Sequence, residues 1–450
     1  MTEKLKTYEN SLPKVFIKTF GCQMNVNDSE FITGQLSRLG YSMTKDILNS
    51  DLILLNTCCV RAKVEQKIYS LIGKIKKIKE NNPDIILGIC GCMASKEKET
   101  LFYKFPYIDL IFGPSQMNEL ENIIIERGAS DNKKYISYEN TSEFSLKNTP
   151  ITRKSKISAW IQIMRGCNNY CSYCVVPYTR GPEQSREVPE ILSEVENLAQ
   201  NNYKEIFLLG QNVNSYGKNL PEPVTFSKLL TLLNNINGIE RIRFMTSHPK
   251  DLNFDLINVI EKCDKVCEHI HLPIQAGSDK ILKIMNREYN IDQYKNIIKE
   301  IRNNIDNVSI TTDIMVGFPG ETDEDFQQTL DTFEEIKFDD AYTFIYSNRE
   351  NTIASLMPDQ VPLQVKKERL WKLINLQKGI STKINKKLEG EVLEVLVDKK
   401  SNKNIPDQLS GRTKTNKTVV FTGEKELVGQ LIKVKILKSD TWTLFGELVK

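Results

Sequence analysis

Three cysteines lie within eight residues, in the stretch Cys167-Asn168-Asn169-Tyr170-Cys171-Ser172-Tyr173-Cys174. The apolar run 157–164 before them is predicted to form a strand, which Gly166 ends. Thiolates are soft ligands that favour zinc, copper(I) or iron–sulfur clusters. A structural zinc site needs four ligands, and neither a fourth cysteine nor a histidine lies near this loop. The stretch therefore favours an iron–sulfur cluster with one open iron. The alternatives are a zinc site completed by a distant residue and buried thiols without a metal.

Strands and helices are predicted to alternate in the first part of the chain. The predicted strands are residues 15–20, 51–55 and 85–89, with helices from Asn27 to Gly40 and over residues 64–79. This alternation is typical of a parallel, doubly wound sheet. The carboxyl ends of its strands lie at one edge, where ligands bind.

Three further cysteines each come just after one of these predicted strands. They are Cys22, Cys58 and Cys92, and they are expected to converge at that edge although they are far apart in the sequence. The result is a second group of three thiols. The alternative interpretation is that they are small buried hydrophobic residues, which is the role we expect for Cys59 and Cys90.

The central region repeats the alternation of strands and helices. Six strands are predicted there, at residues 157–164, 206–209, 242–245, 269–273, 308–316 and 341–346. Polar or glycine-containing residues follow each strand, which fits a partial barrel of parallel strands with its site at the carboxyl ends. Gln211, Asn212, Gln275 and Ser278 are therefore candidate ligand-binding residues. The alternative for each of them is ordinary strand-end capping.

The three histidines and two remaining cysteines carry a weaker signal. His248, His269 and His271 lie in or beside predicted strands, so packed and hydrogen-bonded side chains are favoured over metal ligands. Cys263 and Cys267 are spaced as neighbours on a helix but have no partners that would complete a site. We assign them to the core.

The last part of the chain changes its period. Residues 362–387 predict a long helix with Leu363, Leu370, Leu373, Ile374 and Leu376 on its apolar side. Short alternating runs separated by turns follow it, which indicates a small antiparallel β-barrel. Residues 411–417 form a basic, polar stretch that is expected to be exposed. It is interpreted either as a solvated loop or as a surface that contacts RNA phosphates.

Composition sets the broad class of the protein. The chain has 450 residues, which suggests about two to four domains. Its first residues have no apolar stretch typical of a signal peptide, and no apolar run is long enough to span a membrane. The protein is therefore expected in the cytoplasm, where its ten cysteines stay reduced. The net charge of the whole chain is only +3, so it does not by itself indicate nucleic-acid binding.

The CxxxCxxC stretch and its flank Val176-Pro177-Tyr178-Thr179-Arg180-Gly181, with Glu183 and Ser185-Arg186, resemble the methylthiotransferase branch of the radical S-adenosylmethionine (SAM) superfamily. The resemblance implies an open (β/α)6 barrel and a [4Fe-4S] cluster held by Cys167, Cys171 and Cys174, whose open iron binds SAM. Gln211, Asn212, Gln275 and Ser278 would then contact SAM.

The remaining parts of the chain resemble the same family. The motifs around residues 19–25, 56–61 and 91–94 are similar to its amino-terminal domain, and the segment from about residue 386 resembles the TRAM domain, a tRNA-binding module. This implies an auxiliary [4Fe-4S] cluster on Cys22, Cys58 and Cys92, and RNA contacts by Arg412, Lys414 and Lys417. The expected domains are residues 13–131, 153–383 and 386–450.

Within the family, residues 208–217 and 411–417 are most similar to enzymes that add a methylthio group to C2 of N6-isopentenyladenosine, next to the anticodon (position 37) of tRNA. We expect a monomer that takes electrons from a flavodoxin or ferredoxin and does not bind a membrane. Two alternatives remain: the same chemistry on threonylcarbamoyladenosine or on an aspartate of ribosomal protein S12, and a non-enzymatic RNA-binding protein with structural zinc.

Overall fold

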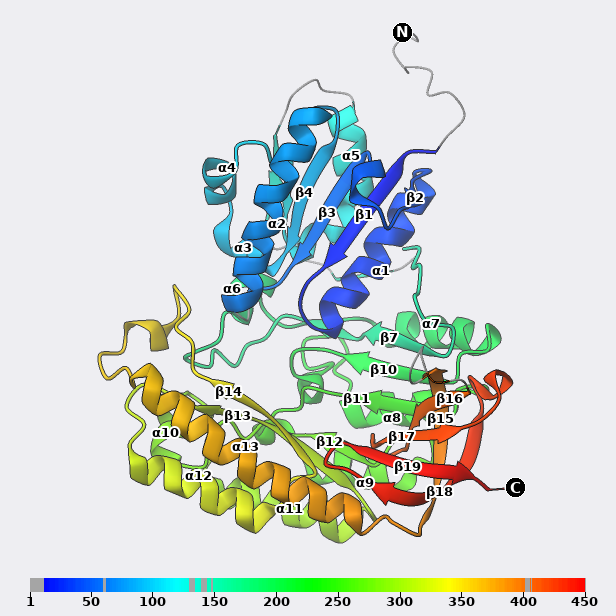
Figure 1. The fold of residues 1–450 in the computed structure, drawn as a ribbon, viewed down its shortest axis with the longest axis vertical. Coiled ribbons are helices and arrows are strands. Elements are labelled where there is room, and N and C mark those ends of the chain that lie inside the picture. The colour runs from blue at the N-terminus through cyan, green and yellow to red at the C-terminus, as the bar shows by residue number, and fades with distance from the viewer. Residues whose placement is uncertain are drawn as a thin grey trace. The chain divides into compact units, whose positions relative to one another are not determined.

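The computed structural model describes residues 12–59, 62–128, 134–138, 144–146, 149–400, 405 and 407–449 (Figure 1). The chain divides into two compact units. The first comprises Met1–Lys154 and Val175–Pro182, and the second comprises Ser155–Cys174 and Glu183–Lys450. Val60 and Arg61 of the motif at residues 56–61, and most of the amino-terminal stretch, lie outside the described residues. No helix in the described part of the chain has the length and apolar character needed to cross a membrane.

The first unit is built on a six-stranded, all-parallel sheet in the order β2-β1-β3-β4-β5-β6 (Figure 1). Its strands are β1 Lys14–Thr19, β2 Ser42–Met43, β3 Leu52–Thr57, β4 Ile86–Gly91, β5 Leu110–Phe112 and β6 Tyr135–Ser137. Its helices are α1 Gln23–Arg38, α2 Ala62–Asn81, α3 Cys92–Glu97, α4 Thr100–Lys104, α5 Leu120–Gly128 and α6 Val176–Arg180, with 3-10 turns η1 Ile47–Asn49 and η2 Pro114–Glu119.

Alternate residues of β3 pack on opposite faces of this sheet. Ile53 and Leu55 join a core with α2, while Leu52 and Leu54 join a second core with α1 and α5. Every residue of β3 is buried, as expected for a central strand of a parallel sheet. The predicted doubly wound sheet is therefore confirmed.

The predicted start of α1 near Asn27 is wrong, because the helix begins at Gln23. Asn27, Asp28, Ser29 and Glu30 look like capping residues in the sequence, but all four are buried within the helix. Their side chains serve tertiary contacts instead. Ser29 bonds Thr19 and Asn56, for example, with Oγ–Oγ and Nδ2–Oγ distances of 2.8 and 2.9 Å.

The second unit contains the six predicted central strands as two parallel ladders, β7-β10-β11 and β12-β13-β14 (Figure 1). A parallel bridge between Ile242 and Val266 lies just before β12. The strands are β7 Ser158–Gln162, β10 Glu205–Leu209, β11 Arg241–Phe244, β12 His269–His271, β13 Ser309–Val316 and β14 Asp340–Ile345. The helices are α7 Val188–Gln200, α8 Phe226–Asn234, α9 Phe254–Lys262, α10 Asp279–Ile284, α11 Ile291–Asn304, α12 Asp323–Ile336 and α13 Leu363–Lys386, with turns η3 Val213–Ser215, η4 Pro249–Asp251 and η5 Ile353–Leu356.

The predicted single strand over residues 157–164 is divided in two. After Gln162 the chain leaves the ladder with β10, and β8 (Met164–Arg165) pairs antiparallel with β9 (Gln184–Ser185). The cysteine stretch lies between β8 and β9, so this short pairing closes the base of the excursion that carries it.

The buried face of α13 also differs from the prediction. Leu373 is fully buried, but Leu363 is 60% exposed. The other buried positions are polar: Lys366, Arg369, Gln377, Ser381 and Asn385. Their end groups bond the protein, as when Gln377 donates to the carbonyl of Phe338 at 2.9 Å. Apolar periodicity could not reveal this face, because the side chains are anchored by hydrogen bonds.

The carboxyl-terminal strands close into a barrel in the order β15-β16-β17-β19-β18. They are β15 Val392–Lys400, β16 Gln408–Arg412, β17 Thr418–Thr422, β18 Leu431–Ser439 and β19 Thr443–Leu448, with turn η6 Lys425–Leu427. The pairings are antiparallel as predicted, apart from the parallel pair of β17 and β19. Sequence analysis missed β16, since its end falls in the stretch interpreted as a loop.

Candidate functional site

The first candidate site is the carboxyl edge of the sheet in the first unit. Cys22 caps α1 just after β1, Cys58 follows β3, and Cys92 begins α3 directly after β4. The register pairs Thr19 with Asn56 and Thr57 with Gly91, so the three strand ends are adjacent. The predicted placement of these cysteines is confirmed. Their role as ligands is a separate question.

Two glycines allow the strand ends to come this close. Gly21 has φ +121°, and a Cβ on it would lie 2.8 Å from the Cβ of Cys58. Gly91 has φ +88°, and its Cβ would lie 2.5 Å from the carbonyl oxygen of Thr57. Any side chain at either position would push β3 away from its neighbour and combine a clash with an unfavourable backbone conformation.

A buried amide network holds the same edge. Asn25 Nδ2 donates to Asn56 Oδ1 at 3.1 Å and to the Thr57 carbonyl at 3.0 Å, and Asn56 Nδ2 donates back to the Asn25 carbonyl at 2.8 Å. Asn25 Oδ1 also lies 3.5 Å from the sulfur of Cys22. Sequence analysis singled out the motif that contains Asn25 but gave this residue no role.

Cys59 has a closer relation to this site than a packing residue would have. It clusters with Cys92 and Val175 and donates to the sulfur of Cys92. This bond, together with the nearby charge of Arg180, lowers the pKa of Cys92 to about 6 even though the thiol is buried. The same contact raises the pKa of Cys59 well above its ordinary value. Cys90, in contrast, is fully buried in an apolar core, as predicted.

A buried ion pair accompanies these cysteines. Arg180, the last residue of α6, places Nη2 2.8 Å from Oδ2 of Asp28, and both side chains are 5% exposed. Burial opposes the charge of the guanidinium, but Cys92, Asp28 and Cys22 together raise the pKa of Arg180 well above its ordinary value. A cation therefore lies beside the thiols. Arg180 belongs to the motif that follows the cysteine loop, but the sequence indicated no function for it.

The second candidate site is the cysteine loop of the second unit. The base of the loop is held by reciprocal bonds, since Asn168 N donates to Glu183 Oε1 at 3.4 Å and Glu183 N donates to Asn168 Oδ1 at 3.1 Å. Cys167 and Cys171 are buried and Cys174 is partly buried. The three cysteines predicted from their spacing therefore share one constrained loop.

The segment after α10 supports this loop from the other side. Ser172 N donates to the Met285 carbonyl at 3.0 Å, and Asn286 Nδ2 donates to the carbonyls of Asn169 and Tyr170 at 3.2 Å each. Arg287 then lies beside the sulfur of Cys171, with an Nη1–Sγ distance of 3.4 Å. Neither Asn286 nor Arg287 was found from the sequence, because their role depends on the fold.

Charge at the second site is arranged differently from the first. Burial is the main reason that the pKa of Cys167 is raised to about 11. Arg287 is 4% exposed and bonds Cys171, Tyr289 and the Pro273 carbonyl. No carboxylate among the described residues forms an ion pair with it. This loop thus places a buried arginine, without a carboxylate partner among the described residues, beside the thiol of Cys171.

The strand-end loops next to this site carry buried polar atoms that lack a hydrogen-bond partner. After β10 they are Gln211 Oε1, Asn212 Oδ1 and both amide atoms of Asn214, and after β11 they are Ser247 Oγ and His248 Nε2. Such atoms are costly unless a ligand or water satisfies them. Two predicted residues, Gln211 and Asn212, belong to this group, whereas Asn214, Ser247 and His248 were missed as binding candidates.

Contacts around these atoms connect them to the cysteine loop. Asn212 Nδ2 donates to Asp251 Oδ2 at 2.7 Å, and Lys218 Nζ lies 2.6 Å from Asp251 Oδ1. Glu183, which holds the base of the loop, bonds Ser215 of η3. His248 stacks edge-on against Tyr289, with ring centroids 5.7 Å apart. Burial, aided by Arg287, lowers the pKa of His248 to about 2, so its ring is neutral.

The two other residues predicted to contact a ligand are used differently. Ser278 is 1% exposed, caps α10 and donates to Asp325 Oδ1 at 2.6 Å, which corresponds to the alternative of ordinary capping. Gln275 has a left-handed backbone with φ 67° and pairs through its main chain with β13. Its side chain is partly exposed.

The expectation that residues 411–417 form an exposed basic loop is wrong. Lys414 Nζ bonds the Asp264 carbonyl and lies 3.5 Å from Glu268. Lys417 pairs with Asp339 at 2.7 Å and is 13% exposed. Arg412 bonds Asn416, and its carbonyl accepts from Arg241. The basic residues join the barrel to the rest of the second unit because acidic and carbonyl groups of the core face them.

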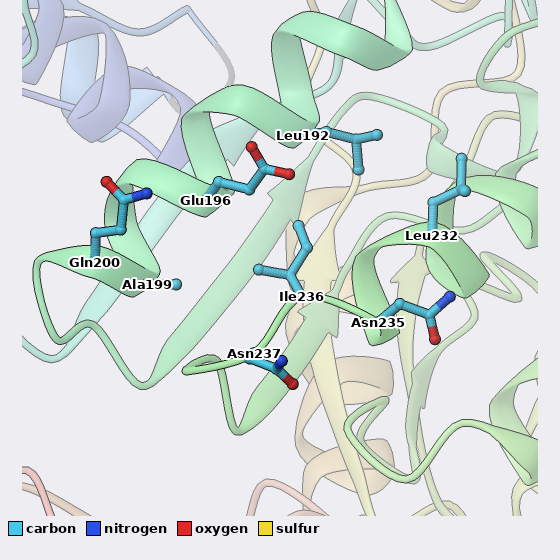
Figure 2. Close-up of a pocket in the computed structure, with 8 residues that line it drawn as sticks. All are labelled: Leu192, Glu196, Ala199, Gln200, Leu232, Asn235, Ile236 and Asn237. Carbon is cyan, nitrogen blue, oxygen red and sulfur yellow. The ribbon is translucent and has the colours of Figure 1, made fainter.

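A cavity of about 450 Å³ lies elsewhere in this unit, between the ends of α7 and α8 (Figure 2). Leu192 and Ile236 form its apolar wall, and Glu196 and Asn235 contribute polar groups (Figure 2). It contains no cysteine. It is also lined by the carboxyl ends of helices, whereas the candidate ligand residues follow the carboxyl ends of strands, so we do not assign it to the functional site.

Both cysteine sets fit iron–sulfur clusters by their chemistry. In the described part of the chain, no three or more His, Cys, Asp or Glu side chains are placed so that they could hold a metal ion together. Each set nevertheless supplies three soft donors and a buried arginine that offsets thiolate charge. The unpartnered polar atoms after β10 and β11 fit a polar ligand such as SAM beside the second set.

Family models match three parts of the chain. A model described as the Radical SAM superfamily matches residues 161–333, one described as Uncharacterized protein family UPF0004 matches residues 14–113, and one described as the TRAM domain matches residues 386–449.

Curated relatives span nearly the whole chain. A protein of Thermoanaerobacter pseudethanolicus is 49% identical over 96% of this chain and 92% of its own. One of Clostridium botulinum is 46% identical over 99% of this chain and 100% of its own. Both are named tRNA-2-methylthio-N(6)-dimethylallyladenosine synthase.

Solved structures share the fold at low identity. The radical SAM methyltransferase TsrM from Kitasatospora setae aligns with a TM-score of 0.56 and 14% identity, over 89% of this chain and 81% of that one. The cobalamin-dependent SAM radical enzyme OxsB aligns with a TM-score of 0.54 and 13% identity, over 82% and 56% of the two chains.

Proposed function

We propose a function from the premise that this chain belongs to the family of tRNA-2-methylthio-N(6)-dimethylallyladenosine synthases. It is a radical SAM methylthiotransferase that adds a methylthio group to C2 of N6-isopentenyladenosine at position 37 of tRNA. The observation that carries this proposal is the presence of two three-cysteine sets, one at the carboxyl ends of three parallel strands and one in a single loop, each beside a buried arginine.

The two sets are assigned as ligands of two [4Fe-4S] clusters. Cys167, Cys171 and Cys174 hold the cluster that binds SAM, and Cys22, Cys58 and Cys92 hold the auxiliary cluster. When bound, SAM and the clusters supply the one-electron chemistry, the sulfur and the methyl group that the reaction needs. The adenine C2–H has no acidic proton for a side-chain base to remove, so no general base is assigned.

The chain's own residues bind and orient SAM. Gln211 and Asn212 present unsatisfied amide oxygens to its polar groups, and Asn214 adds a donor and an acceptor. Asp251 fixes the Asn212 amide by accepting from its Nδ2, which leaves Oδ1 for the ligand. Arg287 holds the cysteine loop, and its positive charge would favour the carboxylate of SAM. Ser278 and Gln275 remain candidates, although Ser278 is already engaged in capping.

The carboxyl-terminal barrel binds tRNA. Lys433, Lys435 and Lys438 of β18 are exposed; the first two alternate with the buried core residues Val434 and Ile436, and Lys438 follows a register shift in the strand. Their side chains thus face outward, where they can contact phosphates. The role first expected for Arg412, Lys414 and Lys417 is less favoured, because Lys414 and Lys417 pair with acidic residues of the central region and Arg412 bonds Asn416 of its own hairpin.

A tRNA-binding assay separates the two groups of basic residues. A K433A/K435A/K438A variant should bind tRNA more weakly, with the slope of log affinity against log salt reduced by about one unit per lost phosphate contact. The K74A/K76A/K77A variant, which removes the same charge from the exposed side of α2, should bind like the wild type. The same assay on R412A/K414A/K417A tests the partly buried basic residues of the 411–417 stretch. Equal affinities and slopes for all variants would reject the barrel as the tRNA-binding surface.

Electrons come from a flavodoxin or ferredoxin, and the protein acts as a cytoplasmic monomer. Nucleoside mass spectrometry of tRNA from cells with and without the gene tests the central proposal. Loss of 2-methylthio-N6-isopentenyladenosine, with accumulation of its unthiolated precursor, is the expected result. Loss of a methylthio group from threonylcarbamoyladenosine or from ribosomal protein S12 would instead identify another substrate for the same chemistry.

A further inference from the structure

We propose that Arg180 is a positioning residue for the auxiliary cluster: Asp28 holds its guanidinium, which donates to the Cys92 sulfur and stabilises the reduced cluster. This inference rests on the proposed ligand role of Cys22, Cys58 and Cys92. It assigns a function to an arginine that lies outside the sheet on which those cysteines are placed.

The elements around Arg180 fix the position of its side chain beside the cysteines. The short helix α6 contacts α3, which begins at Cys92, and Val175 just before α6 packs against Cys59 and Cys92. At the other end of α6, Arg180 reaches Asp28 with an Nη2–Oδ2 distance of 2.8 Å. Gly181, with φ +77°, then turns the chain away. Helix α6 therefore positions the guanidinium of Arg180 beside the thiols.

The ion pair with Asp28 does not by itself explain a charge buried at this place. Taking two charges out of water usually costs more than their mutual attraction returns. Here the thiols of Cys92 and Cys22 also act on the guanidinium and favour its charged form. Thiolates bound to a cluster would add negative charge at the same edge. They would therefore stabilise the charged guanidinium of Arg180 further than Asp28 does alone.

The consequence is a shift in reduction potential. Hydrogen bonds and positive charge at the ligand sulfurs favour the reduced, more negative cluster. Arginine keeps its proton at every pH at which the protein folds, so this effect does not depend on titration. Removing the guanidinium should lower the potential, and removing the Asp28 carboxylate should raise it.

The experiment uses full-length protein in a C167A/C171A/C174A background, so that one cluster gives the signal. Potentials of anaerobically reconstituted variants are measured by redox titration monitored by electron paramagnetic resonance, together with iron content. The R180Q change should shift the potential to a more negative value, R180K should lie closer to the wild type, and D28N should shift it to a more positive value. The R186Q change is the control, because it breaks a buried pair with Glu194 at 2.7 Å in the other unit and should leave the potential unchanged.

The two opposite shifts cannot both arise from loosening the structure, since breaking the same ion pair from either side would loosen it equally. If R180Q does not fold, R180K and D28N decide the matter together: a potential close to that of the wild type in R180K with a positive shift in D28N supports the proposal. An unchanged potential in D28N, or shifts of the same sign in D28N and R180Q, would overturn it. If the background variant binds no cluster, the proposed ligand set fails and this inference fails with it, whereas a cluster with unmoved potentials rejects Arg180 alone.

Discussion

Each of the two cysteine sets has three thiols, but the two sets are assembled from the chain in different ways. Cys22, Cys58 and Cys92 come from three strand ends up to 70 residues apart in the sequence and are gathered by the sheet register. Cys167, Cys171 and Cys174 come from one loop, which is held by the main-chain carbonyl of Met285 and the side-chain amide of Asn286. The first set therefore depends on the whole sheet, while the second depends on a local loop and its support.

Charge separates the two sets as clearly as chain topology. In the first set Asp28 pairs with Arg180, and the pKa of Cys92 is lowered to about 6. In the second set Arg287 has no carboxylate partner among the described residues, and burial raises the pKa of Cys167 to about 11. Under the proposed function, the carboxylate of SAM would supply the anionic partner that Arg287 lacks.

The sharpest test of this comparison removes each set in turn. Alanine variants of Cys167, Cys171 or Cys174 should lose reductive cleavage of SAM completely, as measured by 5′-deoxyadenosine. Variants of Cys22, Cys58 or Cys92 should keep that cleavage and about half of the iron, yet attach no methylthio group to tRNA. Equal loss of SAM cleavage in all six variants, with the fold intact by circular dichroism, would end the proposed division of labour.

A second test concerns the neighbouring thiols Cys58 and Cys59. The C58S change should remove the auxiliary cluster and about half of the iron. The C59S change keeps a hydrogen-bond donor toward Cys92 and should leave both clusters in place. The measurement is iron and sulfide per chain after anaerobic purification. Normal iron in C58S together with a loss in C59S would exchange the two assignments.

A third test breaks the gathering of strand ends without touching a thiol. The G91A change should destabilise β3 and β4 by about 2 kcal/mol more than G40A. Both glycines have positive φ, but a Cβ on Gly40 meets nothing within 4 Å, whereas one on Gly91 meets Thr57. Hydrogen exchange of peptides from β3 and β4 reports the difference. Equal protection in the two variants would show that close approach is not required there.

The smallest expected effect is on acid stability of the second unit. The folded pKa of His248 is lowered to about 2, first by burial and then by Arg287, Lys250 and Lys218. The unfolded chain takes up a proton near pH 6.5, so the free energy of unfolding should fall with acid below that pH, by up to about 1.4 kcal/mol per pH unit. H248Q should remove this contribution. All three tryptophans lie in the second unit, so urea unfolding followed by their fluorescence measures it. If the free energy of unfolding of H248Q depended on pH as steeply as that of the wild type, the lowered pKa of His248 would be contradicted.

Much of the fold could be predicted because apolar periodicity, and the glycine and polar residues that end strands, are local signals in the sequence. The runs that predicted β3, β4 and β10 each coincide with a strand to within two residues. Where polar residues have tertiary partners, the same signals failed. Asn27 and Asp28 looked like helix caps but are buried inside α1, and the polar face of α13 could not be distinguished from a solvated one.

The sequence by itself determined which residues could hold clusters, because the CxxxCxxC spacing and three cysteines after three strands are properties of the chain. Only the tertiary structure decided what surrounds them. Arg180 and Arg287 reach the thiols through α6 and the segment after α10. The basic residues after β16 bond the core rather than face solvent. These outcomes depend on contacts between charged groups and carbonyls that are distant in the sequence. A local sequence pattern cannot predict such contacts, because the packing of the whole unit determines which groups are buried and paired.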